Sequence, residues 1–370
     1  MIYLDYAATT PMSPEALHVY HEVADTYYGN ANSLHTRGTD AANVLQAALA
    51  TLSQTIDDTS VTITRSGSEA NQHAIHRFLS ARQFQGHILT CRAEHPSIRD
   101  YLRTLDEQYP TLHVENVPLD ERGNIQPGDV ETRLKPDTIL ATFAHVQHEI
   151  GTIRDIRAIG TVLARADVPF HSDCVQSYGK IHIPMQDARL SAISTAAHKI
   201  QGPKGLGAVF FSKTVEPSNG LPPGTTDVAA IAAFAEAADV QVKKSPKAWT
   251  HIRTLRAKME EELPADFQVL GERTPVKQSP YILGLCLPEI EGQEAMLACD
   301  REGIAIATGS ACQSGVDQPS ETLLALGHSP DTARTFVRLS FGYETNFAEI
   351  EEAAKKLMNI RPRRAKNAQR

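Results

Sequence analysis

Cysteine and tryptophan are scarce in this chain of 370 residues, which has five cysteines and one tryptophan. The cysteines are odd in number and scattered, and no two form a C-x-x-C pair, so the sequence predicts neither a disulfide framework nor a cysteine-based metal site. We expect no metal elsewhere in the protein. Four cysteines lie in apolar stretches, which predicts buried thiols; they are Cys91, Cys174, Cys286 and Cys299. Cys312 lies instead among small residues.

An excess of positive charge is also missing. The chain has 36 basic and 44 acidic residues, and its net charge of -8 argues against general binding to nucleic acids or membranes. The short basic run at 361–366 fits a solvated chain end. No apolar run approaches the roughly 20 residues of a membrane-spanning helix, and no secretory signal is visible. We therefore expect a cytoplasmic protein that binds neither nucleic acid nor membrane.

The order of apolar segments predicts an α/β fold. Helical patterns at 41–49 and 69–84 alternate with short runs suited to strands, namely 61–64, 87–90, 138–143 and 207–211. This alternation is typical of a mainly parallel sheet with helices on both faces.

A long helical pattern from about 227 to 261 leads into a second unit of mixed α and β character, which ends in an amphipathic helix at 347–358. We expect a large domain of residues 14–250. Residues 1–13 together with 251–370 form the smaller α+β domain, which carries the loop with Cys312.

A lysine after a predicted strand is the first candidate site residue, because ligands of such sheets bind beyond the carboxyl ends of the strands. Lys199 follows His198 and precedes a glycine-rich turn at 202–207. An amine in a partly dehydrated pocket can bind an aldehyde cofactor covalently. The alternative is an ordinary surface lysine.

Two further strand ends carry residues suited to a cofactor. Gly67 and Ser68 begin a helix after a predicted strand, and the N-terminus of such a helix can bind a phosphate. Ser68 also fits an ordinary helix N-cap. Asp173 follows an apolar run and could pair with a pyridinium nitrogen, or it could close the strand at the solvent.

Together with these segments, several motifs resemble those of the cysteine desulfurases and occur in the same order. They are 3–11 (YLDYAATTP), 66–71 (SGSEAN), 93–98 (AEHPSI), 172–176 (SDCVQ), 198–205 (HKIQGPKG), 309–312 (GSAC) and 337–342 (VRLSFG). The resemblance covers nearly the whole chain and is to NifS/IscS-like members of the class-V aminotransferases. It implies a pyridoxal phosphate-dependent transferase of fold type I, similar to aspartate aminotransferase, with a mainly parallel seven-stranded sheet. It also implies a homodimer with active sites at the subunit interface.

The resemblance assigns roles to residues that match the motifs. Lys199 holds pyridoxal 5'-phosphate, and His95 stacks on its ring and takes part in proton transfer. Asp173 pairs with the pyridine nitrogen, and Gln176 lies near the ring hydroxyl. Gly67, Ser68 and His198 match the positions that hold the phosphate.

Two residues are assigned to the substrate and to the partner subunit. Arg338 matches the arginine that binds the substrate carboxylate, a task suited to a planar guanidinium. Thr225 matches a threonine that reaches the phosphate of the partner subunit's cofactor.

Cys312 matches the nucleophile that removes sulfur from L-cysteine, leaving L-alanine and a persulfide. Its loop of small residues at 307–315 resembles the family branch with a flexible cysteine arm, and the persulfide passes to an acceptor for iron-sulfur cluster assembly or other sulfur transfer. The segments 149–153 and 172–176 resemble the NifS-like branch linked to NAD biosynthesis, whose client is an iron-sulfur quinolinate synthase.

Three features depart from the family pattern. His148 stands where many relatives have the second of two asparagines; we expect it to contact the cofactor or the substrate carboxylate and to titrate near neutrality. Ala196 replaces a serine that contacts the phosphate, and strand alternation points Thr195 the other way. The loop at 216–224 is shorter than the stretch that relatives contribute to the partner's site.

Two alternatives stay open at this stage. One is selenocysteine lyase or another pyridoxal phosphate enzyme of the same fold, although an aminotransferase has no use for a nucleophilic cysteine. The other is a weakly active relative that serves as a scaffold for sulfur-transfer partners. An active desulfurase is favoured by the joint retention of Lys199, His95, Asp173, Gln176, Arg338 and Cys312.

Overall fold

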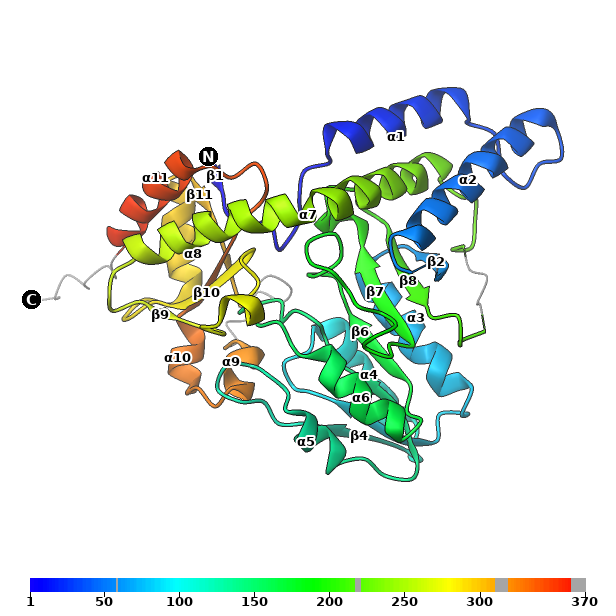
Figure 1. Cartoon of the computed structure of the whole chain (residues 1–370). Coiled ribbons are helices and arrows are strands. Elements are labelled where there is room, and N and C mark those ends of the chain that lie inside the picture. The colour runs from blue at the N-terminus through cyan, green and yellow to red at the C-terminus, as the bar shows by residue number, and fades with distance from the viewer. Residues whose placement is uncertain (58, 217–220, 310–318, 361–370) are drawn as a thin grey trace, which may run out of the picture.

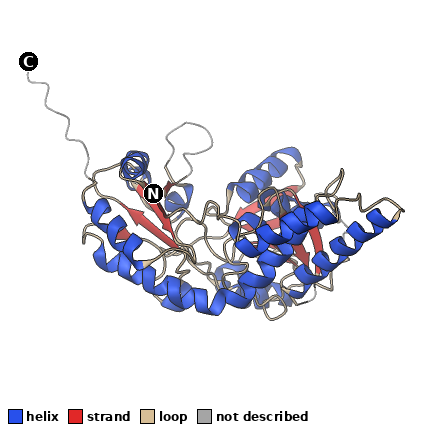
Figure 2. Ribbon diagram, turned by 90° about the horizontal axis from the view of Figure 1, so that it is seen from above, coloured by secondary structure: helices blue, strands red, loops and turns tan. Residues whose placement is uncertain are grey.

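Two main β-sheets, each covered by helices, and one two-stranded sheet organise the described part of the chain (Figures 1 and 2). The computed structural model describes residues 1–57, 59–216, 221–309 and 319–360. Cys312 therefore lies outside the described residues, as does part of the loop at 216–224.

The larger sheet has seven strands in the order β2-β8-β7-β6-β5-β3-β4. Its strands are β2 (Ser60–Thr64), β3 (Gly86–Thr90), β4 (Leu112–Asn116), β5 (Thr138–Thr142), β6 (Phe170–Asp173), β7 (Ala192–Ala196) and β8 (Gly207–Phe211). Only β8 runs antiparallel to its neighbours, β2 and β7. Every residue of β6, β7 and β8 is buried, as expected for strands covered on both faces. The predicted α/β fold with a mainly parallel sheet is confirmed.

Helices from the same part of the chain surround this sheet. They are α1 (Pro14–Thr26), α2 (Thr36–Gln54), α3 (Gly67–Ser80), α4 (Pro96–Gln108), α5 (Pro127–Glu131) and α6 (Ile156–Arg165). The helix predicted to reach residue 84 ends at Ser80, because Gln83 and Phe84 take left-handed backbone angles (φ 53° and 57°) that end the helical hydrogen-bond pattern.

The smaller sheet has four antiparallel strands in the order β12-β13-β10-β9, with bounds β9 (Gln268–Val269), β10 (Ile282–Cys286), β12 (Ala307–Thr308) and β13 (Phe336–Ser340). Beside it, β1 (Ile2–Tyr3) pairs in parallel with β11 (Ile304–Ala305), so the N-terminus joins the second unit. The helices here are α8 (Gly292–Arg301), α9 (Glu321–Ala325), α10 (Pro330–Arg334) and α11 (Phe347–Met358). The last is the predicted amphipathic helix, with its predicted bounds.

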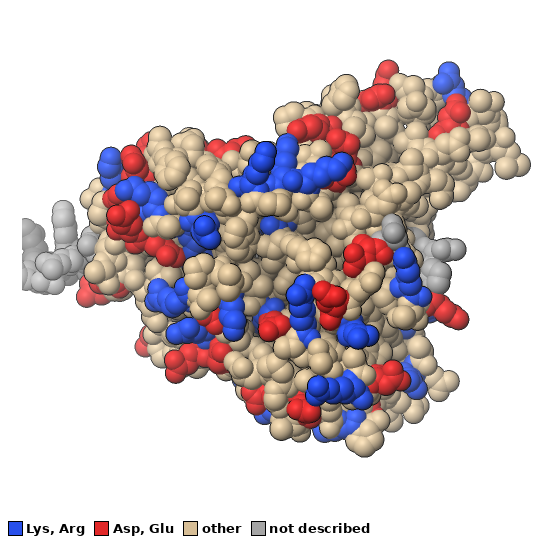
Figure 3. All heavy atoms as spheres, viewed as in Figure 1, with Lys and Arg blue, Asp and Glu red and all other residues tan. Residues whose placement is uncertain are grey.

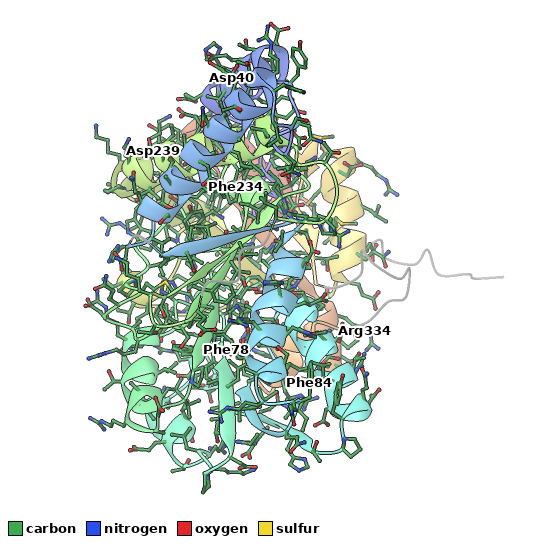
Figure 4. All side chains as sticks on the ribbon, turned by 90° about the vertical axis from the view of Figure 1, so that its right-hand side faces the viewer. Asp40, Phe78, Phe84, Phe234, Asp239 and Arg334 are labelled. Carbon is green, nitrogen blue, oxygen red and sulfur yellow. The ribbon has the colours of Figure 1, made fainter. Side chains whose placement is uncertain are left out.

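The long helix α7 (Val228–Glu262) runs along both units (Figure 1). Its first half is rich in alanine and packs on α1 and α2, and its Phe234 is fully buried in the core around the larger sheet (Figure 4). Its second half places Ile252, Leu255 and Met259 in the core around the smaller sheet. The division that we propose near residue 250 therefore falls inside α7.

The outer surface carries both signs of charge. Basic and acidic side chains are interspersed on the face shown in Figure 3. Within the described ranges, none of the helices combines the length and the apolar character needed to cross a membrane. The four cysteines predicted to be buried are free thiols in the interior, which confirms that prediction; they are Cys91, Cys174, Cys286 and Cys299.

Candidate active site

One edge of the larger sheet gathers most of the candidate residues. The parallel strands β3, β5, β6 and β7 end at this edge; Asp173 is the last residue of β6, and the chain after β3, β5 and β7 carries His95, His148 and Lys199. Asp5 and Arg338, which come from the N-terminus and from β13, meet at the same place. The sheet topology thus brings together residues that lie up to 333 positions apart in the chain.

Lys199 ends a short 3-10 turn after β7, and its amine is enclosed. Nζ donates to the carbonyl oxygens of Ala7 and Ala8 at 2.5 and 2.8 Å. Burial, and then the charge of Arg338, lower the pKa of Lys199 to about 8, although Asp5 and Asp173 oppose the shift. Lys199 is therefore not the ordinary surface lysine of the alternative reading.

A chain of hydrogen bonds joins Asp173 to His95. Asn71 of α3 donates from Nδ2 both to Asp173 Oδ2 at 2.8 Å and to Ser97 Oγ at 3.0 Å. Ser97 Oγ lies 2.8 Å from His95 Nδ1, which also accepts the backbone N–H of Ser97. Val175 N–H donates to the other oxygen of Asp173. The carboxylate and the imidazole are thus held in a fixed relation by a buried asparagine.

His148 contacts His95 edge to face, with ring centroids 5.3 Å apart. Burial, and then the nearby His95 and the cations Arg338 and Lys199, lower the pKa of His148 well below its usual range. The prediction that His148 titrates near neutrality is wrong, because the fold buries this imidazole and places cationic neighbours from distant parts of the chain beside it. His148 is a neutral imidazole at physiological pH.

Arg338 projects from β13 toward the same edge. One terminal nitrogen donates to the backbone carbonyl of His148 at 3.0 Å, and the other donates to Asp5 Oδ1 at 3.1 Å. Nε is buried and has no hydrogen-bond partner among the residues that the structure describes. A guanidinium with a free donor in an enclosed site is suited to an anionic ligand.

Gln176 shares a backbone acceptor with Lys199. Its Nε2 donates to the carbonyl of Ala7 at 2.9 Å, and its Oε1 accepts from Lys180 Nζ at 3.2 Å. Burial, and then the charge of Lys199, lower the pKa of Lys180 to about 7, and its amine lies 5.5 Å from the ring centroid of Tyr281. A second partly neutral amine therefore borders the site.

The N-terminus of α3 lies against the end of β7. A Cβ built on Gly67 would lie 3.0 Å from Cβ of Ala196 and 3.1 Å from a methyl group of Val175, so any larger residue here would have to displace these neighbours slightly. The helix is capped by Ser66, whose Oγ accepts from the backbone N–H of Glu69 at 3.1 Å. Ser68, which we predicted as a possible cap, is instead exposed in the first helical turn.

Two neighbours complete this corner. His198 accepts or donates a hydrogen bond at 3.1 Å between its Nδ1 and the hydroxyl of Thr9, and burial lowers its pKa to about 4. The hydroxyl of Thr195 donates to the carbonyl of Ala208, so it faces its own sheet and does not replace the hydroxyl missing at Ala196. The expectation from strand alternation is confirmed for Thr195.

Of the predicted site residues that the structure describes, one is not part of this cluster. Thr225 is exposed in the loop that precedes α7. Cys312 belongs to a segment outside the described residues, although its neighbours in sequence, β12 and α9, are both described.

A buried ion pair connects the chain segments that carry His95 and His148. Arg154 donates to Glu94, the residue before His95, and both side chains are fully buried. Glu94 also accepts from the backbone N–H of Ala144 and from the thiol of Cys91. The pair therefore ties the segment that carries His95 to the segment that carries His148.

Several of these contacts were missed by sequence reasoning. Asn71, Ser97 and Glu94 lie inside motifs that we quoted, but no role was assigned to them. Arg154 and Lys180 lie in segments where nothing marks them as special. A buried polar residue close to a matched motif is the one signal that could have indicated them.

Known proteins resemble this chain along almost all of its length. The class-V aminotransferase family model matches residues 2–223 and 216–352. A NifS protein of Halalkalibacterium halodurans, whose name places it among the cysteine desulfurases, is 35% identical over 362 residues, which are 95% of this chain and 95% of that protein. A NifS protein of Bacillus subtilis, named in the same way, is 34% identical over 95% of this chain and 92% of its own length.

Among solved structures, a NifS-like protein superposes with a TM-score of 0.88 over 96% of this chain and 98% of its own. The two sequences are 23% identical, so this likeness supports the fold alone.

Proposed function

This chain belongs to the class-V aminotransferase family and is a NifS-like cysteine desulfurase, in which we propose that Lys199 holds pyridoxal 5'-phosphate and Cys312 takes sulfur from L-cysteine. The observation that carries the proposal is the enclosed amine of Lys199, whose pKa is lowered to about 8. A neutral amine is the form that can bond to the aldehyde of the cofactor.

The residues around Lys199 fit this cofactor. Asn71 and Val175 hold Asp173 in place to pair with the ring nitrogen, and Gln176 would lie near the ring hydroxyl. The start of α3 at Gly67 and Ser68, together with His198, would hold the phosphate, because first-turn N–H groups of a helix favour an anion. His95 would stack on the ring.

The ring nitrogen, when protonated opposite Asp173, makes the bound cofactor an electron sink for the carbon that bears the substrate amino group. We assign removal of the Cα proton to Lys199 Nζ, with His95 as the second proton carrier. Arg338 would hold the substrate carboxylate through its free Nε. His148 is neutral and lies beside His95 and Arg338. It would donate a hydrogen bond to the cofactor or to the substrate carboxylate.

In the proposed reaction, the sulfur of the substrate is transferred to Cys312. Its thiolate attacks Sγ of the substrate, the Cβ–Sγ bond breaks, and the carbon side is protonated to L-alanine. The products, L-alanine and a persulfide on Cys312, balance one L-cysteine and one thiol.

We further propose a cytoplasmic homodimer in which Thr225 acts in the partner subunit's site, since it is exposed on its own chain. The persulfide would pass to an iron-sulfur scaffold or client protein, of which an iron-sulfur quinolinate synthase is one candidate. Selenocysteine as substrate is the competing proposal, since the site would hold either amino acid by its carboxylate.

The direct test uses wild-type protein and the Cys312→Ala variant. We expect the wild type to be yellow with bound cofactor, to release equal amounts of L-alanine and transferable sulfur from L-cysteine, and to carry a persulfide on Cys312 by mass spectrometry. The Cys312→Ala variant should keep the colour and lose sulfur transfer. Normal sulfide release by this variant would remove Cys312 from the reaction, and equal or higher turnover of selenocysteine would favour the lyase.

The lowered pKa of Lys199 also predicts how the apoenzyme takes up added pyridoxal phosphate. At pH 7 about a tenth of amines with a pKa of about 8 are neutral, against about 0.03% for an ordinary lysine. The uptake rate, followed by absorbance, should therefore rise with pH and level off above about pH 8. N-acetyl-lysine methylamide, the control amine, should show no plateau below about pH 10. An apoenzyme whose rate still climbs beyond pH 9.5 would contradict the lowered pKa.

A further inference from the structure

Two described residues on either side of the segment that carries Cys312 lie close together. A Cβ built on Gly309 would lie 2.9 Å from Cβ of Ser320, although the two residues are eleven positions apart. The same built atom would lie 3.2 Å from Oε1 of Glu149 and 3.2 Å from the ring of Phe336. Only a glycine fits here without displacing a neighbour.

Glu149 contacts both sides of this junction. Oε1 faces Gly309, and Oε2 accepts a hydrogen bond from Ser320 Oγ at 2.9 Å. Glu149 is 7% exposed, and burial raises its pKa against the hydrogen bonds from Thr322 and Ser320. Among the described residues, Glu149 has no ion-pair partner, and it is not an assigned site residue, so its burial requires another explanation.

The backbone around Glu149 is itself held firmly. Gln147 accepts from the N–H groups of Glu149 and Ile150 at 2.7 and 2.8 Å, and donates to Thr322 of α9 at 2.9 Å. The turn at 147–150 is therefore hydrogen-bonded to α9, which follows the Cys312 segment in the chain.

The chain before the Cys312 segment is paired with Arg338, the residue that we assign to the substrate carboxylate. Ala307 of β12 pairs with Arg338 of β13, and Arg338 donates to the carbonyl of His148, the residue before Glu149. Arg338 is therefore hydrogen-bonded both to the strand that precedes the Cys312 segment and to the turn that carries Glu149.

We propose that Glu149 is a positioning residue for sulfur transfer, closing the base of the Cys312 segment between Gly309 and Ser320 and joining it to the Arg338 strand. This inference rests on the proposed role of Cys312. Glu149 touches neither cofactor nor substrate in this assignment. It acts by limiting the positions from which the thiol can reach the substrate sulfur.

The test compares Glu149→Ala, Glu149→Gln and Gly309→Ala in the holoenzyme. Glu149→Ala should slow persulfide formation on Cys312 by about tenfold or more, because small errors in placing a reacting group are costly. Glu149→Gln keeps an oxygen acceptor for Ser320 and should recover most of the rate. Gly309→Ala should push Gly309 and Ser320 apart. Its rate of persulfide formation should therefore resemble that of Glu149→Ala. The dissociation constants of cofactor and of alanine, measured by absorbance, should stay within about twofold of the wild type.

Glu272→Gln is the matched control, because Glu272 is about equally buried (8% exposed) but its carboxylate bonds to Asn124 and Arg122 rather than to Ser320. Its persulfide rate should match the wild type. Alkylation of the four buried cysteines reports general unfolding and should stay slow in every variant.

Wild-type persulfide rates in both Glu149→Ala and Gly309→Ala would overturn the inference. An equal loss of cofactor affinity, or rapid alkylation of the buried thiols, would show a general structural role instead and would also overturn it. If the wild type itself forms no persulfide on Cys312, the proposed function fails before Glu149 is tested.

Discussion

The Lys199→Ala variant is expected to purify without the visible absorbance of bound pyridoxal phosphate and to lose at least about a thousandfold in sulfur release from L-cysteine. Lys199 supplies the enclosed amine at the edge where Asp173 and the start of α3 also lie, and its removal takes away both the covalent anchor and the base assigned to the Cα proton. Absorbance spectra and an alanine assay measure the two losses separately.

Lys204→Ala is the matched control for this variant. Lys204 lies in the same glycine-rich turn five residues later and is exposed, so its loss should leave colour and rate close to those of the wild type. Adding a small primary amine such as methylamine to Lys199→Ala should restore part of the proton-transfer rate if Lys199 is the base. A yellow, active Lys199→Ala protein would show that another amine, such as that of Lys180, holds the cofactor.

The second large effect is expected from Arg154→Met. This change leaves the carboxylate of Glu94 buried without its cation, and both side chains are fully buried in the native fold. Removing one partner of a buried pair typically costs about 3–5 kcal/mol in the free energy of unfolding. Urea denaturation of the apoenzyme measures the loss.

A double variant separates the charge from the packing. Glu94→Gln with Arg154→Met removes both charges and should regain much of the lost stability, because no isolated charge is left in the interior. Arg65→Met, which breaks the exposed pair with Glu69, should change stability little. A single Arg154→Met variant as stable as the Arg65→Met control would show that the pair contributes no more than a surface contact.

The same pair also bears on the reaction. Glu94 precedes His95, and Arg154 is bonded through its backbone N–H to the segment that leads to His148. In a folded Arg154→Met protein the 5.3 Å contact between the two imidazoles should loosen, and turnover should fall more than cofactor affinity does.

Local patterns were sufficient for the fold and for the type of reaction. Strand and helix periodicity predicted the order of elements and the bounds of α11, since each depends on residues within one turn or a few positions. The chemistry was predicted from the resemblance of the motifs around Lys199 and Cys312 to those of the cysteine desulfurases, because the residue types alone left an ordinary surface lysine as the alternative for Lys199. The prediction that Ser68 could cap α3 was wrong, since Ser66 is the cap and a serine two residues away is an equally good cap by composition.

Properties that depend on distant partners were decided by the tertiary structure. The pKa of His148 is set by burial and by His95, Arg338 and Lys199, which arrive from three other segments. The link from Asp173 through Asn71 to His95, and the junction of Gly309 and Ser320 on Glu149, are contacts across the fold that no spacing in the chain reveals. The sequence by itself therefore determined which chemical groups this protein brings to sulfur transfer. Only the tertiary structure decided their charge states and their alignment, because both depend on dehydration and on neighbours far away in the chain.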